Sequence, residues 1–156
     1  MQAPPKSDSL WETDADAAGA AMTKADFPHL LSPLTVGRVT LRNRAFSSAH
    51  GTGFGSGGTG LINDRHIEYQ RARARGGIAL VVIEATSIDD SPIGAGTGGN
   101  NLRNTGDEVM PAYRRMAEAV HDEGAKICCL LSHSGRNTVM GAQGAPPIDP
   151  SAIPMD

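Results

Sequence analysis

Residues 78–85 read IALVVIEA, a continuous apolar run rich in β-branched residues that ends close to a glutamate. Such a run is typical of a strand that is buried on both faces of a parallel sheet. A second run, KICCLL at residues 126–131, has the same character, and we expect it to be buried as well. Strands of this kind need helices around them, so these two runs indicate an α/β fold.

The segments before each of these runs have the pattern of helices. Residues 64–75 are predicted to form a helix that is capped by Asn63 or Asp64 and stopped by Gly76 and Gly77. The second predicted helix ends at Gly124, carries Pro111 in its first turn and has Asp107 as its expected cap. Its buried face is formed by Val109, Tyr113, Met116 and Val120.

An antiparallel hairpin is predicted ahead of these units. Apolar residues alternate with polar ones over 34–41, around a two-residue turn formed by Gly37 and Arg38. Residues 44–49 then give a brief strand candidate, and the segment from the end of the 78–85 strand to about Asn104 reads as a glycine-rich loop. The order hairpin, strand, helix, strand, helix, strand predicts a parallel sheet, which belongs either to a doubly wound fold or to part of a (β/α)₈ barrel.

Composition narrows the range of functions. The chain has 156 residues, a 39% hydrophobic and 20% charged composition and a net charge of −3, which is ordinary for one globular domain. That charge offers no broad basic surface to nucleic acid or to an anionic membrane, so we expect small-molecule partners. No apolar run approaches the ~20 residues that span a bilayer. The acidic, alanine-rich start of the chain does not resemble a signal peptide, and we expect a cytoplasmic protein.

Two further features fit this reading. Residues 1–26 mix Pro, Ser, Asp and Ala with little periodic hydrophobicity, which predicts a disordered tail ahead of the folded part at 27–156. Cys128 and Cys129 are adjacent, so they are badly placed to bridge each other and too few for a thiolate metal cage. We expect them to be buried thiols in a reducing compartment, and no metal site is predicted.

Polar residues gather where each predicted parallel strand ends, which is where α/β folds bind their ligands. The first strand is followed by AFSSAHGTGFGSGGTG at 45–60, whose glycines fit a phosphate cradle, a flexible linker or the roof of an active site. A dinucleotide fingerprint would need a helix to start inside these glycines, and none is predicted before Asn63. Side chains follow the three strands as Ser47, Ser48 and His50, as Glu84, Thr86 and Ser87, and as Ser132, His133, Ser134 and Arg136.

Several of these residues have two readings. His50 contacts a ligand or is a hydrogen-bonded loop residue, and Arg136 either attracts an anionic group or is an exposed loop arginine. We expect His133 to support loop geometry and Glu84 to be a buried, hydrogen-bonded carboxylate with a structural role. His66 and His121 are predicted at surface positions of the two helices and are given no role.

Four blocks of sequence, in this order, resemble the N-terminal third of Old Yellow Enzyme family proteins: LLSPLTVGRVTLRNR, GGIALVVIEATSI, AVHDEGAKICCLLSHSGR and PSAIP. The resemblance covers about residues 27–156. It implies a (β/α)₈ barrel whose bottom is closed by the hairpin, with FMN at the carboxyl ends of the strands and NAD(P)H as an electron donor. It further implies an FMN-dependent oxidoreductase, either an ene-reductase or an amine demethylase-like enzyme.

The same resemblance assigns residues to the cofactor. Ser48, Ala49, His50 and Gly51 match the end of the first strand, which lines the flavin ring, and Ala85 matches a small residue that leaves room for the ring. His133 and Arg136 are the residues expected near the substrate. The glycines after His50 would then form the first loop above the flavin, with the phosphate of the cofactor held elsewhere.

Three departures from the family pattern stand out. Gly51 occupies the position at which one branch carries a cysteine bonded to the flavin, so FMN is expected to be noncovalent. Leu130 stands where the third strand usually carries a glutamine that hydrogen-bonds the pyrimidine edge of the flavin. The substrate-anchoring pair, the phosphate-binding loops and the cysteines that hold an iron–sulfur cluster in some branches would all follow Asp156.

Three strand units cannot close an eight-stranded barrel, which takes about 250 residues. We therefore expect the chain to be a truncated N-terminal part of an FMN-binding barrel and to be inactive alone. The alternative is a short, non-catalytic protein that binds a partner, or forms an oligomer, through its open sheet.

Overall fold

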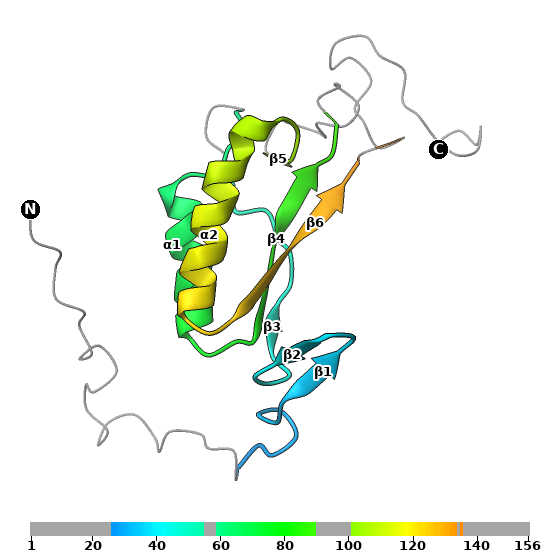
Figure 1. The fold of residues 1–156 in the computed structure, drawn as a ribbon, viewed down its shortest axis with the longest axis vertical. Helices are drawn as coiled ribbons and strands as arrows, with labels where there is room; N and C mark the ends of the chain where they lie inside the picture. Colours follow the sequence, from blue (N-terminus) through cyan, green and yellow to red (C-terminus); the bar gives the residue numbers. More distant parts are fainter. Residues whose placement is uncertain (1–25, 55–58, 90–100, 134, 136–156) are drawn as a thin grey trace, which may run out of the picture.

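A parallel sheet with two helices on one face forms the main body of the structure (Figure 1). The computed structural model describes residues 26–54, 59–89, 101–133 and 135. Nearly all of the predicted tail, Arg136 and the proline-rich end of the chain lie outside these residues. The α/β class and the order of the elements agree with the sequence-based prediction.

Strand β4 (Leu80–Ser87) lies at the centre of the sheet, and all of its pairings are parallel. Strand β6 (Lys126–Ser132) pairs along one edge of β4 over its whole length. The other edge is shared by β3 (Phe46–Ser47), at the start of β4, and β5 (Leu102–Arg103), at its end. The prediction missed β5, because a two-residue strand inside a glycine-rich loop leaves no periodic signal.

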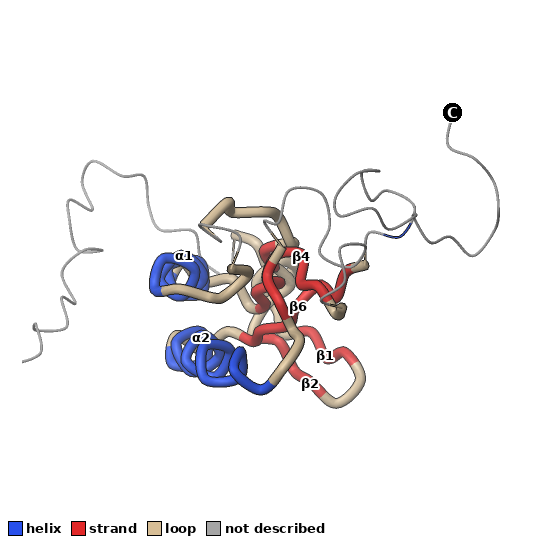
Figure 2. The backbone as a smooth tube through the Cα atoms, turned by 90° about the horizontal axis from the view of Figure 1, so that it is seen from above, coloured by secondary structure: helices blue, strands red, loops and turns tan. Residues whose placement is uncertain are grey.

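Helices α1 (Asp64–Arg75) and α2 (Met110–Asp122) pack side by side on one face of β4 and β6 (Figure 2). Because alternate strand residues face the helices, Val81 and Ile83 of β4 enter the core there. The helices contribute Ile67, Ala74, Met116, Ala119 and Val120 to this core. Neither helix, nor any other among the described residues, is long and apolar enough to cross a membrane.

The two helices begin differently. The side chain of Asn63 accepts hydrogen bonds from the first turn of α1, as predicted. The prediction that Asp107 caps the second helix is wrong. Asp107 instead opens a short 3₁₀ helix, η2 (Asp107–Val109), which runs directly into α2, so α2 starts at a residue that is already helical and has no side-chain cap.

The predicted hairpin is confirmed as β1 (Leu34–Val36) and β2 (Val39–Leu41), with Gly37 at a positive φ of 59° in its turn. It lies at the amino ends of β4 and β6 (Figure 1). Arg42, just after β2, fixes this end of the sheet. Its guanidinium donates hydrogen bonds to the carbonyl oxygens of Ala74, Ile78 and Glu123, at 2.6, 2.8 and 2.8 Å, near the ends of both helices.

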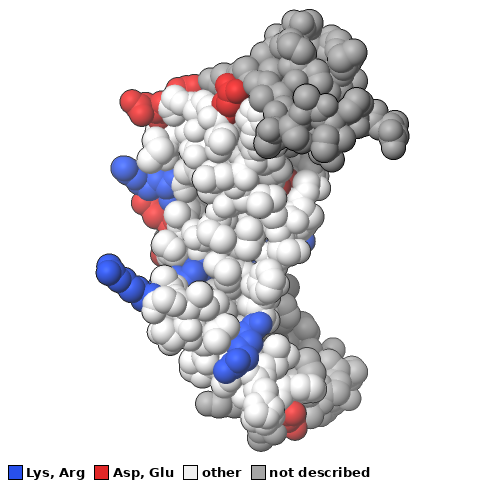
Figure 3. Space-filling model, turned by 90° about the vertical axis from the view of Figure 1, so that its right-hand side faces the viewer, with Lys and Arg blue, Asp and Glu red and all other residues white. Residues whose placement is uncertain are grey.

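The prediction that β6 is a buried strand is wrong. Leu130 and Leu131 keep 48% and 58% of their surface exposed, and Cys128 is exposed while Cys129 is half-buried. Within the described residues β6 has a partner along one edge only, and the helices cover one face of the sheet. Figure 3, viewed from the side on which β6 lies, shows a central surface with few charged side chains.

Candidate functional site

A cavity of about 240 Å³ opens at the carboxyl ends of the strands. It is lined by Gly51, Gly53, Glu84, Ala85 and Asn101, which come from the loop after β3, from β4 and from the residue before β5. A Cβ atom added to Gly51 would meet no other atom within 4 Å, so the backbone there borders open space. The structure thus brings two of the predicted cofactor residues, Gly51 and Ala85, to one cavity.

An irregularity in β4 determines which side chains reach this cavity. Ile83 pairs with Cys129 and Ala85 pairs with Leu130, so Glu84 is an extra residue without a partner on β6. Bulges of this kind redirect side chains and are common beside functional sites. Because paired residues share a face of the sheet, Ala85 lies on the same face as Leu130, and Glu84 is turned toward the loop after β3 and the start of α1.

Glu84 is buried, with 3% of its surface exposed, and both carboxylate oxygens are engaged. Its Oε1 accepts a hydrogen bond from Nε2 of His66 at 3.1 Å, and its Oε2 accepts one from the backbone N–H of Thr52. The expectation of a buried, hydrogen-bonded Glu84 is therefore confirmed. The prediction that His66 lies on the surface is wrong, since only 1% of it is exposed.

The hydrogen bonds of His66 define its protonation state. Its Nδ1 accepts from the backbone N–H of Asn63 at 3.2 Å, so this nitrogen carries no proton, and Nε2–H is the donor to Glu84. A second proton on Nδ1 would break the first of these bonds. Burial lowers the pKa of His66 below its ordinary 6.5, against the opposing effect of Glu84. His66 is therefore neutral, and it donates its single ring proton to the carboxylate of Glu84.

The loop beside the cavity is held at further points. The backbone N–H of Phe54 donates to the hydroxyl of Thr52 at 3.2 Å, and the side chain of Asn63 donates to the carbonyl oxygen of Phe54 at 2.8 Å. The ring of Phe54 packs edge-on against His66, with centroids 5.6 Å apart. Residues 52–54 are thereby tied both to β4 and to the start of α1.

His50 turns toward helix α1. Its Nε2 is hydrogen-bonded to the hydroxyl of Tyr69, which in turn accepts from Arg73. The carbonyl oxygen of Ser48 only accepts, so Nδ1 of His50 donates to it at 3.3 Å, and in the neutral ring Nε2 then accepts the proton of the Tyr69 hydroxyl. Both ring nitrogens of His50 therefore have partners within the chain. In this arrangement His50 offers a ligand the flat face of its ring or its backbone, and not a ring nitrogen.

The remaining predicted residues lie at the same end of the sheet or outside the described residues. Ser48 and Ala49 follow β3 directly, and His133 follows β6. Nε2 of His133 lies 3.7 Å from a carboxylate oxygen of Asp89, and its Nδ1 accepts from the backbone N–H of Gly135 at 3.1 Å, which fits the predicted role in loop geometry. Arg136 is outside the described residues.

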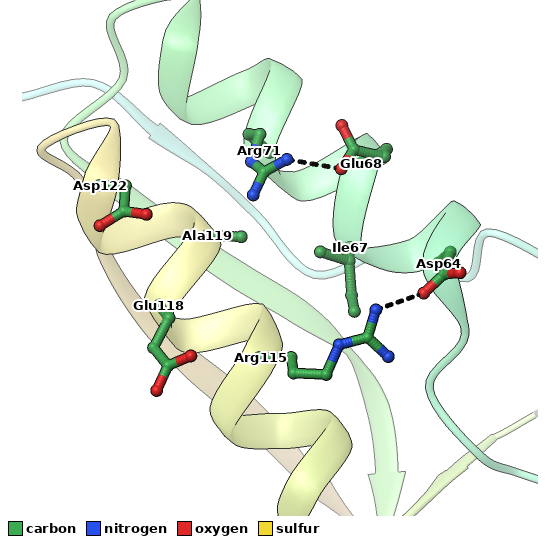
Figure 4. A pocket seen from close by; sticks show the side chains of 8 residues that line it. All are labelled: Asp64, Ile67, Glu68, Arg71, Arg115, Glu118, Ala119 and Asp122. Atoms are coloured by element: carbon green, nitrogen blue, oxygen red, sulfur yellow. Dashed lines mark hydrogen bonds and ion pairs between the residues drawn. The ribbon is translucent and has the colours of Figure 1, made fainter. Parts of the chain in front are cut away.

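A larger hollow of about 480 Å³ lies between α1 and α2 on the outer layer (Figure 4). Its walls carry charges of both signs, and two exposed ion pairs cross or border it, Arg115 with Asp64 at 2.6 Å and Arg71 with Glu68 at 2.7 Å. Exposed pairs of this kind stabilise a helix interface weakly. The hollow lies on the helix layer and shares no lining residue with the cavity at the strand ends, and we assign it no role in ligand binding.

Sequence reasoning missed His66, Tyr69 and Asn101. The buried residues of α1 are His66, Ile67, Gln70 and Ala74, which fall on one helical stripe. Two of the four are polar, so the stripe is not visible as hydrophobic periodicity. One signal was available, because His66 is the third residue after the cap Asn63, the position from which a side chain reaches back to the cap.

Comparison with known proteins agrees with this arrangement. The family described as NADH:flavin oxidoreductase / NADH oxidase matches residues 29–156. The chain belongs to this family. The Old Yellow Enzyme homologue of Zymomonas mobilis superposes on 81% of the chain with a TM-score of 0.68 and 28% identity, which confirms the resemblance and the partial (β/α)₈ barrel.

Two curated relatives of this flavin oxidoreductase family member are named for different reactions, an NADH oxidation and a demethylation. The chain is 36% identical over 129 residues to an NADH oxidase of Thermoanaerobacter brockii, and 38% identical over 112 residues to a probable N-methylproline demethylase of Rhizobium meliloti. These matches cover 82% and 70% of this chain but only 19% and 16% of the relatives. The chain also spans 34% of the Zymomonas protein.

Proposed function

We propose that this chain is the N-terminal part of an FMN-dependent oxidoreductase that uses NAD(P)H or an oxidisable amine. The observation that carries the proposal is the convergence of Gly51 and Ala85 on one cavity at the carboxyl ends of parallel strands. This is the end at which barrel enzymes place their active sites. The short span relative to curated family members supports the view that further barrel units complete the site.

The residues around the cavity fit one face and the surroundings of a planar ring. Gly51 borders open space, and the methyl group of Ala85 protrudes only a short way from β4. A flat group can therefore approach the backbone closely at both positions. Leu130, in register with Ala85, offers carbon atoms to the edge of such a ring and no hydrogen bond. The fit is therefore good in shape, and hydrogen bonds to the ring edge have to come from backbone or other side chains.

Bound FMN would supply hydride transfer, and the protein would bind and orient it. Ser48, Ala49, His50 and Gly51 would line the ring along the loop after β3, and Ala85 would lie beneath it. Since Gly51 has no thiol, the cofactor would be noncovalent. His133, which follows β6 directly, would lie on the substrate side. Arg136 is the other residue that the family resemblance assigns to the substrate.

The substrate class has two candidates. One is an activated alkene that accepts a hydride, and the other is an N-methylated amine that gives one up. The chain is about equally similar to the relative named NADH oxidase and to the relative named demethylase. Any iron–sulfur cluster would be bound by residues beyond this chain.

The test uses the protein encoded by the complete gene. Native mass spectrometry should show a chain more than twice this length with one FMN, released on denaturation. Steady-state assays with NADPH plus an enone, and with an N-methylated amino acid plus an electron acceptor, separate the two substrate classes. The isolated chain of 156 residues should be inactive in both assays. A complete protein that carries no flavin would contradict the proposal.

A non-catalytic role has one observation in its favour. Leu130 and Leu131 of β6 are 48% and 58% exposed, so this strand offers an apolar surface and, among the described residues, an unpaired edge. A protein that binds a partner through this edge would be found in its source at about 16.2 kDa, without flavin. The same native mass measurement therefore distinguishes the two functions.

A further inference from the structure

We infer that Glu84 and His66 form a positioning pair that fixes the loop at Thr52 as the wall of the cofactor cavity. The inference rests on the proposed function, and it assigns to these two residues a role that they perform through their contacts with each other and with the loop. His66 and Glu84 keep 1% and 3% of their surface exposed, and Glu84 lines the cavity beside the wall that Gly51 and Gly53 form on either side of Thr52.

The chemistry of the pair explains why a carboxylate is needed. Glu84 receives hydrogen bonds from two donors at once, the Nε2–H of His66 and the backbone N–H of Thr52. An ionised carboxylate only accepts, so it satisfies both donors, and charged hydrogen bonds are stronger than neutral ones. Because the bulge leaves Glu84 without a partner on β6, this side chain is free to link β4 to the loop.

His66 connects the same carboxylate to the helix. Its Nδ1 accepts from the backbone N–H of Asn63, while the side chain of Asn63 caps α1 and holds the carbonyl oxygen of Phe54 at 2.8 Å. The start of α1, the loop and the end of β4 therefore form one connected network of hydrogen bonds. A change at Glu84 or His66 loosens the loop, and a change at His66 does so without altering a residue that lines the cavity.

The consequence for binding is entropic. A glycine-rich wall has many accessible conformations, and ordering it at the moment of binding would reduce the affinity for the cofactor. The pair orders the wall beforehand. We therefore expect loss of the pair to weaken FMN binding and, even without FMN, to speed hydrogen exchange at the amide of Thr52, because that amide then donates to water.

The experiment compares four variants of the complete protein. Glu84→Ala removes the contacts with both Thr52 and His66, whereas His66→Leu removes the hydrogen bonds of His66 with Glu84 and Asn63 and leaves the bond from Thr52 to Glu84. His66→Gln keeps an amide that can donate to Glu84 and accept from Asn63, so it should rescue the function. Glu68→Gln, on an exposed carboxylate of the same helix that pairs with Arg71, is the matched control. The readouts are the dissociation constant of FMN by flavin fluorescence and hydrogen exchange of the peptide around Thr52 in the flavin-free protein.

The expected result is about ten-fold or greater loss of FMN affinity in Glu84→Ala and His66→Leu, with faster exchange around Thr52 in both. His66→Gln and Glu68→Gln should stay within about two-fold of the unmodified protein. Folded Glu84→Ala that binds FMN and exchanges as the unmodified protein does would overturn the inference, as would equal behaviour of His66→Leu and His66→Gln. If the unmodified protein binds no FMN, the proposed function fails, and the exchange data alone decide on the pair.

Discussion

Ala85 of β4, which lines the cavity, and Leu130 of β6 are paired in register on the same face of the sheet. This pairing combines a residue that fits the family resemblance with one that departs from it. The small side chain of Ala85 would leave room for a flat cofactor, whereas Leu130, 48% exposed, is an apolar side chain at a position where the family resemblance leads us to expect a glutamine. The two positions can therefore be tested separately: Ala85 for the space that it leaves to the cofactor, and Leu130 for the hydrogen bond that it does not make.

Replacing Leu130 with glutamine should tighten FMN binding about three- to ten-fold, which corresponds to one added hydrogen bond at the ring edge. Leu130 is half-exposed, so the polar side chain should cost little stability. Flavin fluorescence titration of the complete protein measures the change. Leu130→Met is the control, because it is about the same size and adds no hydrogen-bonding amide. Equal affinity in the two variants would show that the pyrimidine edge of the flavin does not reach position 130.

Replacing Ala85 with phenylalanine should weaken FMN binding about ten- to hundred-fold, because the ring and the new side chain compete for the same volume. Ala85→Ser, which adds one oxygen, should change affinity far less. Thermal unfolding without FMN should be nearly the same for both variants, since Ala85 is only half-buried and its side chain borders a cavity. Unchanged FMN binding in Ala85→Phe would place the cofactor somewhere other than over β4.

The sequence allowed the alternation of strands and helices to be predicted because Val81, Ile83, Met116 and Val120 stand in the periodic positions that a two-layer core requires. It failed at β6, where the run at 126–131 predicts a strand buried on both faces, while the structure packs Ile127 and Cys129 partly against the core and leaves Cys128, Leu130 and Leu131 exposed. Hydrophobicity records what a strand is suited to contact. It does not indicate which segment covers the strand, and among the described residues no segment covers the second face of β6.

The site was predicted in part for a similar reason. Gly51 and Ala85 follow strand signals and match a family pattern, so both could be placed at the strand ends. The contacts of Glu84 with His66 and Thr52 depend on a bulge between Ile83 and Ala85, and one extra residue in a strand has no periodic signature. Residues that hold a site in place are therefore harder to find from sequence than residues that line it.

Replacing Arg42 with alanine should lower the free energy of unfolding by about 2 kcal/mol, because three carbonyl oxygens near the helix ends lose a charged donor. Arg42→Lys should recover only part of this loss, since a single ammonium group cannot reach all three carbonyls in the same geometry. Urea unfolding measures the change. Arg38→Ala, in the exposed hairpin turn, should stay within about 0.5 kcal/mol of the unmodified protein. A similar loss in both variants would mean that the Arg42 contacts contribute little.

Acidification should destabilise the fold through His66. Its pKa in the folded protein is lowered from 6.5, mainly by burial, with Arg65 acting in the same direction and Glu84 in the opposite one. The unfolded chain therefore takes up a proton before the folded protein does. The contribution of His66 to stability is complete above about pH 6.5 and is lost as the pH falls toward the lower folded value.

Urea unfolding should thus show a free energy of unfolding that decreases as the pH is lowered from about 7.5 to about 5.5. His66→Gln, which cannot titrate in this range and retains an amide donor for Glu84, should have a flatter profile. His121→Gln, at an exposed position of α2, is the matched control and should keep the slope of the unmodified protein, because it leaves the contacts of His66 with Glu84 and Asn63 in place. An equally steep profile in His66→Gln would assign the pH dependence to other groups and would remove the evidence that His66 is held neutral beside Glu84.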